Sequence, residues 1–130
     1  MTAPGLLDAT VLIAMPEVID LMPEITAIAA ITAAELAAAP HLTSDPMEAA
    51  RRQLRLQEVT AVYEPIPFDA AAAASYGLIA AAVSRRGRTP RRRLADLLIA
   101  ATAHAHGLDV YTRNPDDFAG LDDLVRVVAV

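Results

Sequence analysis

The stretch LADLLIAATAHAHGLDVYT, Leu94–Thr112, predicts a helix that is followed closely by a strand. Its first part is rich in Ala and Leu, which lose little side-chain freedom in a helix. Gly107 stands where helices commonly end in a left-handed residue, and the β-branched and aromatic residues after it favour a strand. We therefore expect a helix at Leu94–His106 and a strand at Asp109–Thr112.

The rest of the chain also alternates between strand-like and helix-like segments. The further predicted strands are Gly5–Asp8, Ile25–Ile31 and Leu124–Val130, and the further predicted helices are Ala33–Ala39, Pro46–Thr60 and Ala70–Ser84. Such alternation implies an α/β fold with a central, mostly parallel sheet of four to five short strands, flanked by helices on both faces. Because 130 residues is a common size for one domain, we expect a single domain over residues 1–130.

Four shorter segments carry weaker signals. Val11–Met15 predicts a helix or a turn, and Arg85–Pro90 predicts a loop because it contains Gly and Pro. Tyr63–Phe68 contains two prolines and is therefore a short edge strand at best. Arg113–Gly120 predicts a polar loop with one turn of helix.

Capping residues mark the predicted helix starts. Thr32 precedes Glu35 by three residues, the spacing of a capping box, in which each side chain bonds the other residue's backbone amide. Either Ser44 or Asp45 caps the next helix, and Asp69 caps the helix after it.

The composition excludes several classes of protein. The chain has no cysteine, so it contains neither disulfides nor thiolate metal sites. No apolar run approaches the ~20 residues that a membrane-spanning helix needs, and the apolar N-terminal segment is interrupted by Asp8 and lacks the basic region of a signal peptide. We therefore expect a cytoplasmic protein that does not interact with membranes.

The net charge is −5, yet positive charge is concentrated in one segment. The chain has no lysine, and its arginines crowd at Arg85, Arg86, Arg88, Arg91, Arg92 and Arg93. A guanidinium group suits phosphate because its planar fork donates two parallel hydrogen bonds. The segment is either a solvated loop or a surface for RNA phosphates and unstacked bases, and its position directly before the helix of Asp96 favours RNA binding.

Three acids interrupt apolar runs: Asp8 in GLLDATVLI, Glu35 in ITAAELAA and Asp96 in LADLLIAA. Burying an unpaired carboxylate costs several kcal/mol, so such positions need compensation. All three fall at predicted strand ends or helix starts, at the edge where open α/β sheets bind ligands. A shared Mg²⁺ ion would compensate them, because it prefers hard oxygen ligands.

Each of these acids also has a purely structural interpretation. Asp8 would accept backbone hydrogen bonds in a turn, and Glu35 would complete the capping box. Asp96 would lie in the first helical turn, where the helix dipole favours a negative charge.

Four segments together resemble the motifs of PIN domains. LDATVL (7–12) resembles the first motif, ITAAEL (31–36) the second, ADLLIAATA (95–103) the third and YTRNPDDF (111–118) the fourth. They occur in the family's order and cover nearly the whole chain, which is compact, like the VapC-type toxins of this family. The resemblance implies a PIN-like three-layer sandwich in which Asp8, Glu35 and Asp96 are catalytic and bind the metal.

Two hydroxyl residues are supporting candidates. Ala9 stands where the family commonly has Thr, although Thr10 provides a hydroxyl in the next position. Thr112 either orients Asp8 or Asn114 or simply ends a strand.

The family's fourth acidic position falls on Asn114, which carries no charge. Either Asn114 coordinates through its carbonyl or a water, or Asp116 or Asp117 replaces it. The two aspartates also suit loop capping, which puts a second metal ion in more doubt than the first.

The resemblance implies a magnesium-dependent endoribonuclease, with Mn²⁺ as the alternative metal, that leaves 3′-hydroxyl and 5′-phosphate products. It also implies a cognate VapB-type antitoxin and a homodimer within a larger toxin–antitoxin complex, for which Ala70–Ala82 is a candidate dimer face. Two alternatives stay open. One is a PIN-domain RNA-processing nuclease without an antitoxin, and the other is a catalytically degenerate PIN binding module.

Overall fold

A computed structural model describes residues 3–88 and 93–130 of the chain. At its centre is a sheet of four short strands: β1 (Gly5–Leu7), β2 (Thr26–Ala27), β3 (Asp109–Thr112) and β4 (Val127–Ala129). The strands lie in the order β2-β1-β3-β4, and each neighbouring pair is parallel. The predicted α/β fold with a parallel sheet is confirmed.

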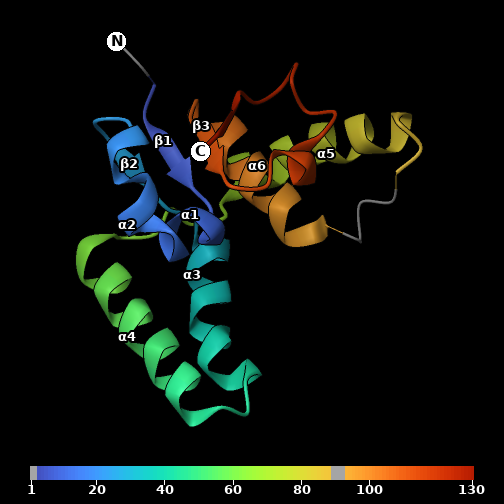
Figure 1. Cartoon of the computed structure of the whole chain (residues 1–130). Coiled ribbons are helices and arrows are strands. Elements are labelled where there is room, and N and C mark those ends of the chain that lie inside the picture. The colour runs from blue at the N-terminus through green and yellow to red at the C-terminus, as the bar shows by residue number, and fades with distance from the viewer. Residues whose placement is uncertain (1–2, 89–92) are drawn as a thin grey trace.

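Helices lie on both sides of this sheet (Figure 1). In chain order they are α1 (Ala9–Ile13), α2 (Met15–Val18), α3 (Ala30–Ala38), α4 (Pro46–Val62), α5 (Ala70–Arg85) and α6 (Leu94–His106), with short 3₁₀ turns η1 (Ile19–Leu21), η2 (Ala39–Leu42) and η4 (Pro115–Phe118). Helices α3 and α4 form a hairpin that projects away from the sheet, whereas α5 packs along α6 (Figure 1). Within residues 3–88 and 93–130, no helix is both long enough and apolar enough to cross a membrane.

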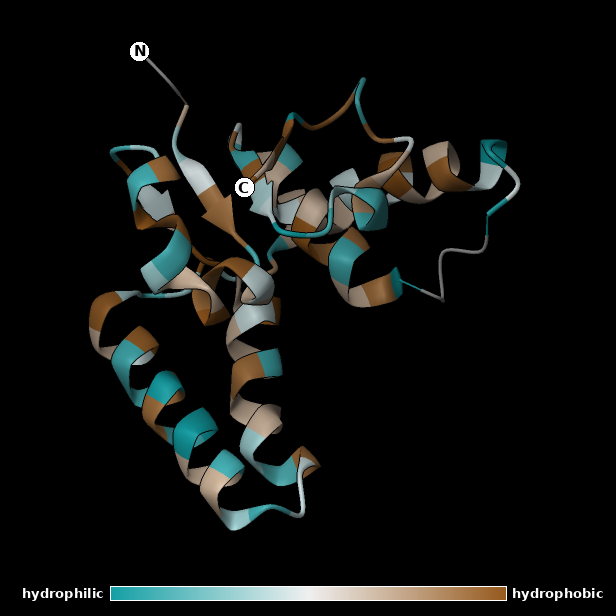
Figure 2. Cartoon of the chain, in the orientation of Figure 1, coloured by the Kyte–Doolittle hydropathy of each residue, from teal (hydrophilic) through white to brown (hydrophobic). Residues whose placement is uncertain are grey.

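The central strands bury both of their faces, because successive side chains of a strand point in opposite directions. Leu6 and Val110 lie in one apolar cluster, with side chains of α5 and α6. Leu7 and Tyr111 lie in a second cluster, with side chains of α1, α3 and α4. The sheet is therefore the middle of three layers, as the sandwich prediction requires. In Figure 2 the end of β1 is hydrophobic, whereas α4 alternates between hydrophilic and hydrophobic residues along its length.

Two predicted strands are much shorter than expected. Of Ile25–Ile31 only Thr26–Ala27 pairs with β1, because α3 already begins at Ala30, whose amide bonds the carbonyl of Ile66. Of Leu124–Val130 only Val127–Ala129 is a strand, because its partner β3 offers no more than three pairing residues.

The segment Tyr63–Phe68 forms a single bridge rather than a strand. Ile66 bridges Ala29, and its amide bonds the carbonyl of Ile28. The flanking prolines have no amide hydrogen to extend this pairing, so the expectation of an edge strand at best is correct.

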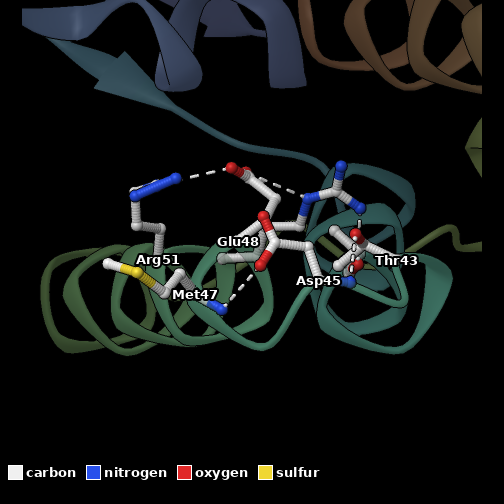
Figure 3. Close-up of polar contacts among 7 residues, drawn as sticks. Thr43, Asp45, Met47, Glu48 and Arg51 are labelled. Carbon is white, nitrogen blue, oxygen red and sulfur yellow. Dashed lines mark hydrogen bonds and ion pairs between the residues drawn. The ribbon is translucent and has the colours of Figure 1, made fainter.

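Helix α4 is capped by Asp45, one of the two candidate residues. Its Oδ1 accepts a hydrogen bond from the amide of Met47 at 3.1 Å, and its own amide donates to Oγ1 of Thr43 at 3.2 Å (Figure 3). One turn on, the carboxylate of Glu48 accepts from Nε of Arg51 at 3.3 Å (Figure 3). The first turn of α4 is thus fixed by side chains that the sequence places there.

The start of α5 and the segment from α6 to β3 follow the sequence closely, whereas α3 begins at Ala30, three residues before its predicted start. Asp69 caps α5 by accepting from the amide of Ala72 at 2.9 Å. Helix α6 ends at Gly107, whose φ of 66° is left-handed. Both α6 and β3 have the predicted bounds.

Candidate acidic site

Asp8 lies directly after β1 and caps α1. Its amide donates to the carbonyl of Tyr111 at 3.1 Å, which fixes the backbone of Asp8 at the end of β3. Oδ1 accepts from the amide of Val11 at 3.2 Å and from the hydroxyl of Thr10. The turn interpretation of Asp8 is therefore correct, and the side chain is only 4% exposed. Within the described part of the chain, no hydrogen bond reaches Oδ2, so this oxygen is available to a ligand.

Thr10 connects Asp8 to the segment that follows β3. Its Oγ1 donates to Asp8 and accepts from the amide of Arg113 at 3.0 Å. Thr112 is fully buried, and its Oγ1 accepts from the amide of Asn114 at 3.0 Å. Thr112 therefore orients the backbone of Asn114 rather than Asp8, and Thr10 is the hydroxyl that positions Asp8.

Asp96 lies in the first turn of α6, as its structural interpretation requires. Burial, and after it the nearby negative charges of Asp117 and Asp8, together raise the pKa of its carboxyl from the usual 3.8 to about 6. The guanidinium group of Arg93 acts in the opposite direction and lowers the pKa. The negative charges around Asp96 are thus only partly compensated by the protein.

Glu35 does not belong to a capping box. The N-cap of α3 is Ala29, and Thr32 lies inside the helix, fully buried, with its Oγ1 unpaired among the described residues. The prediction failed because α3 starts earlier than the Ile-rich segment suggested. A capping role therefore no longer explains why a carboxylate stands at position 35.

The carboxyl of Glu35 lies within electrostatic reach of the other two acids. Glu35 is an exposed residue, but enough protein surrounds its carboxyl group for desolvation to raise the pKa of that group. The charges of Asp96 and Asp8 raise this pKa further. The charge of Asp8 thus raises the pKa of both Glu35 and Asp96, and the charge of Asp96 raises that of Glu35. The fold therefore brings the three predicted acids to one region.

Of the three candidates for the fourth position, the structure brings Asp117 to Asp96. Asp117 is half-buried in η4, and its charge is the largest electrostatic contribution to the raised pKa of Asp96. Asn114 and Asp116 are exposed. The 3₁₀ turn η4 begins at Pro115 and contains Asp117, three residues after Asn114.

The arginine segment is only partly described. Arg91 and Arg92 lie outside the described residues, and Arg85, Arg86 and Arg88 are exposed. Arg93 lies closer to the acids: its Nη1 donates to the carbonyl of Asp116 at 2.6 Å. Its Nη2 is buried and has no partner among the described residues. This arginine therefore borders the acidic region, as predicted from its place in the sequence.

Comparison with protein families decides the classification. The PIN domain family matches residues 6–124, most of the chain. The chain belongs to the PIN-domain family. Among curated protein sequences, none matches the chain significantly.

Solved structures of PIN-like chains support this assignment. A chain of VapBC-5 from Mycobacterium tuberculosis, a member of the VapBC family of toxin–antitoxin systems, is 33% identical with a TM-score of 0.86, and the match covers 99% of this chain and 100% of that one. FitAcB from Neisseria gonorrhoeae has a chain that is 29% identical with a TM-score of 0.76, and 95% of each chain is covered. VapBC2 from Rickettsia felis shares the fold at 19% identity and a TM-score of 0.74, over 97% and 98% of the two chains. The resemblance to VapC-type PIN toxins is confirmed.

The oxygen donors of this PIN domain suit a hard cation. Within residues 3–88 and 93–130, the acids do not form a ready cluster of three that would ligate one ion directly. Mg²⁺ usually keeps several waters and needs only one or two direct carboxylates. The charges of these carboxylates oppose one another, and no group of the described residues bonds Oδ2 of Asp8. Such donors fit an ion that is held partly through water.

The contact between Nη1 of Arg93 and the carbonyl of Asp116 was not predicted from the sequence. Asp117 was one of the three predicted candidates for the fourth position, although the sequence also suggested a loop-capping role for it. It stands directly before Phe118, which is buried.

Proposed function

We propose that this PIN domain is a magnesium-dependent endoribonuclease, the toxin of a VapBC-type pair, that hydrolyses RNA phosphodiesters. The observation that carries this proposal is a group of carboxylates, Asp8, Asp96 and Asp117, gathered in a chain that matches the PIN domain over residues 6–124. Structural carboxylates are normally paired, whereas perturbed and uncompensated ones gather at functional sites. A bound divalent cation would remove this repulsion.

The residues divide into ligands and supporting groups. Asp8 and Asp96 would hold Mg²⁺, with Mn²⁺ as the alternative, and Asp117 would add a third carboxylate. When bound, the metal would polarise a phosphoryl oxygen and lower the pKa of a bound water. Glu35 would either hold that ion through water or act as the base that positions the attacking water.

Supporting groups fix these carboxylates and the substrate. Thr10 holds Oδ1 of Asp8, which leaves Oδ2 for the ion. Arg93 presents a buried Nη2 that has no partner among the residues that the structure describes, and such a donor suits an oxygen of the substrate phosphate. The resemblance to VapC-type toxins further implies 3′-hydroxyl and 5′-phosphate products.

The partner would be a cognate VapB-type antitoxin, as the VapBC names of the solved relatives suggest. An apolar groove of this chain supports such a partner. It runs between α4 and the α1–η1 segment as two adjoining hollows of about 490 and 310 Å³, which share Leu12, Met15, Ile19, Arg55 and Glu58. An antitoxin segment with apolar and charged side chains would cover it, and a basic side chain nearby would neutralise the acids.

The homodimer also stays a proposal. Leu78 on α5 is 52% exposed, and several alanines of the predicted Ala70–Ala82 face are exposed beside it. Small side chains on this face let a second helix approach closely.

Asp96→Asn tests the enzymatic proposal. The purified variant should keep the fold but lose RNA cleavage that is sensitive to EDTA, whereas Asp122→Asn, at an exposed turn, should cleave like the parent. Cleavage by Asp96→Asn at the parent's rate would refute the assigned site. A parent that binds RNA and Mg²⁺ without cleaving would favour the degenerate binding module. The candidate antitoxin is a small protein encoded beside this one. If co-expression of that protein leaves RNA cleavage at its full rate, an RNA-processing nuclease is favoured.

A further inference from the structure

A second polar cleft lies where the C-terminal end of α5 meets the segment after η4. Its volume is about 250 Å³, and it is lined by Ala82, Arg85, Arg86, Gly120, Asp123 and Leu124. None of these residues belongs to the acidic site described above. Two arginines in one cleft make it a candidate site for an anion.

Gly120 determines how Arg86 lies in this cleft. The glycine has a φ of +90°, and a Cβ there would stand 2.3 Å from Cδ and 2.8 Å from Nε of Arg86. Non-bonded atoms do not approach so closely, so a side chain at position 120 would displace Arg86. The arginine therefore lies across the turn at Gly120 instead of extending freely into solvent.

Neither arginine of the cleft is neutralised by the described part of the protein. Arg85 and Arg86 are exposed, and the ion pairs found within residues 3–88 and 93–130 do not include them. Asp123 lines the same cleft but forms no ion pair with either of them. In contrast, Arg51, Arg52, Arg113 and Arg126 all pair with carboxylates. The two guanidinium groups are thus available to an outside anion.

The cleft and the acidic site lie along one segment of the chain. Asp117, whose charge affects Asp96, is three residues before Gly120. At the acidic site, Arg93 is bound to the η4 backbone at Asp116, with its Nη2 unpartnered among the described residues. One arginine, Arg93, therefore lies at Asp116 and another, Arg86, lies at Gly120. Positive charges at both ends of this short segment suit an anion whose charges repeat along a chain, such as a nucleic-acid backbone.

We propose that this cleft binds a backbone phosphate of single-stranded RNA, next to the phosphodiester that lies at the acidic site. The proposal rests on the ribonuclease function proposed above. Arg86 donates two hydrogen bonds to the phosphate oxygens, and Arg85 adds a second positive charge. Asp123 opposes the anion and weakens its binding.

The test measures RNA binding without cleavage. The probe is a fluorescein-labelled single-stranded RNA of mixed sequence and about 12 nucleotides, bound to Asp96→Asn protein in EDTA. Anisotropy titrations between about 50 and 200 mM KCl give the affinity and its salt dependence. Three further substitutions are each combined with Asp96→Asn: Arg86→Ala, Asp123→Asn and the control Arg51→Ala. Arg51 is exposed on α4, so its removal changes the charge equally but outside the cleft.

Arg86→Ala should weaken RNA binding about tenfold, the usual size of one lost charged hydrogen-bonding contact. It should also reduce the slope of log K against log salt by about 0.7, the value for one phosphate of a single strand. Asp123→Asn should strengthen binding, and Arg51→Ala should change neither quantity. If the RNA binds but Arg86→Ala and Arg51→Ala behave alike, the cleft proposal is wrong and the ribonuclease proposal stands. If the background protein binds no RNA and the parent cleaves none, both are wrong.

Discussion

Asp96→Asn should make the protein more stable at neutral pH while it removes activity. The pKa of Asp96 is about 6 in the folded chain, against 3.8 without the fold. Between these values the folded state binds more protons than the unfolded state, so the free energy of unfolding falls as pH rises through this window. Asparagine does not titrate, so the free energy of unfolding of Asp96→Asn does not fall with pH for this reason.

The size of the effect follows from the same pKa. A tenfold change in an acidity constant corresponds to about 1.4 kcal/mol, so the rise to about 6 sets an upper limit of about 3 kcal/mol. Because Asp96 is only half-buried, water screens its charge, and we expect about 1 kcal/mol. In a domain of this size that is a rise of about 3 to 6 °C in Tm.

Thermal and urea unfolding in EDTA at several pH values between about 3.5 and 8 would measure this difference. The stabilisation should be complete above pH 7, shrink through the window and vanish below about pH 4. Asp122→Asn is the matched control and should follow the parent at every pH. Adding Mg²⁺ should stabilise the parent more than Asp96→Asn. A variant that is as stable as the parent, or less stable, at pH 7.5 would show that Asp96 is not held among uncompensated charges.

Three further predictions concern the groups around the site. Thr10→Val should weaken Mg²⁺ binding, measured by calorimetry, and lower the unfolding free energy by about 1 kcal/mol, because it removes two hydrogen bonds that connect Asp8 with Arg113; unchanged Mg²⁺ affinity would count against it. Gly120→Ala should destabilise the fold by about 1 to 3 kcal/mol in urea because of its φ of +90°, and Arg86→Ala in the same chain should relieve part of that loss; a neutral substitution would contradict the close contact. Ser75→Ala should cost about 1 kcal/mol, because Oγ of Ser75 lies 2.8 Å from Nδ1 of His104 between α5 and α6; equal melting curves would show that this bond adds no net stability.

Local signals predicted the helices well and the strands only in part. Helix α6 has the predicted bounds because Gly107 ends it and an Ala-rich sequence fills it. The stretch from Ile25 to Ile31 looked like one strand, since β-branched residues are common in strands. Whether such a stretch pairs depends on its neighbours, and here the chain turns into α3 after pairing two residues with β1.

The acidic site was predictable where the sequence interrupts an apolar run. Asp8 and Asp96 stand in such runs, and the structure brings them near enough for the charge of Asp8 to raise the pKa of Asp96. Asp117 gave no comparable signal, because acids are common in polar loops. Its approach to Asp96 depends on the 3₁₀ turn of η4 and on the burial of Phe118, and both are tertiary features.

The order of the strands has a consequence for the protein while it is being made. β1 lies between β2 and β3, and Leu6 pairs with Val110, so the sheet joins two segments that are far apart in the sequence. Pairing over such separations has to wait until the distant segment exists. The amide of Arg113 therefore reaches Thr10, and Asp117 reaches Asp96, only after the segment beyond α6 has been synthesised. A nascent chain that stops before this segment holds the acids as separate pieces, so the acidic site is not assembled in it.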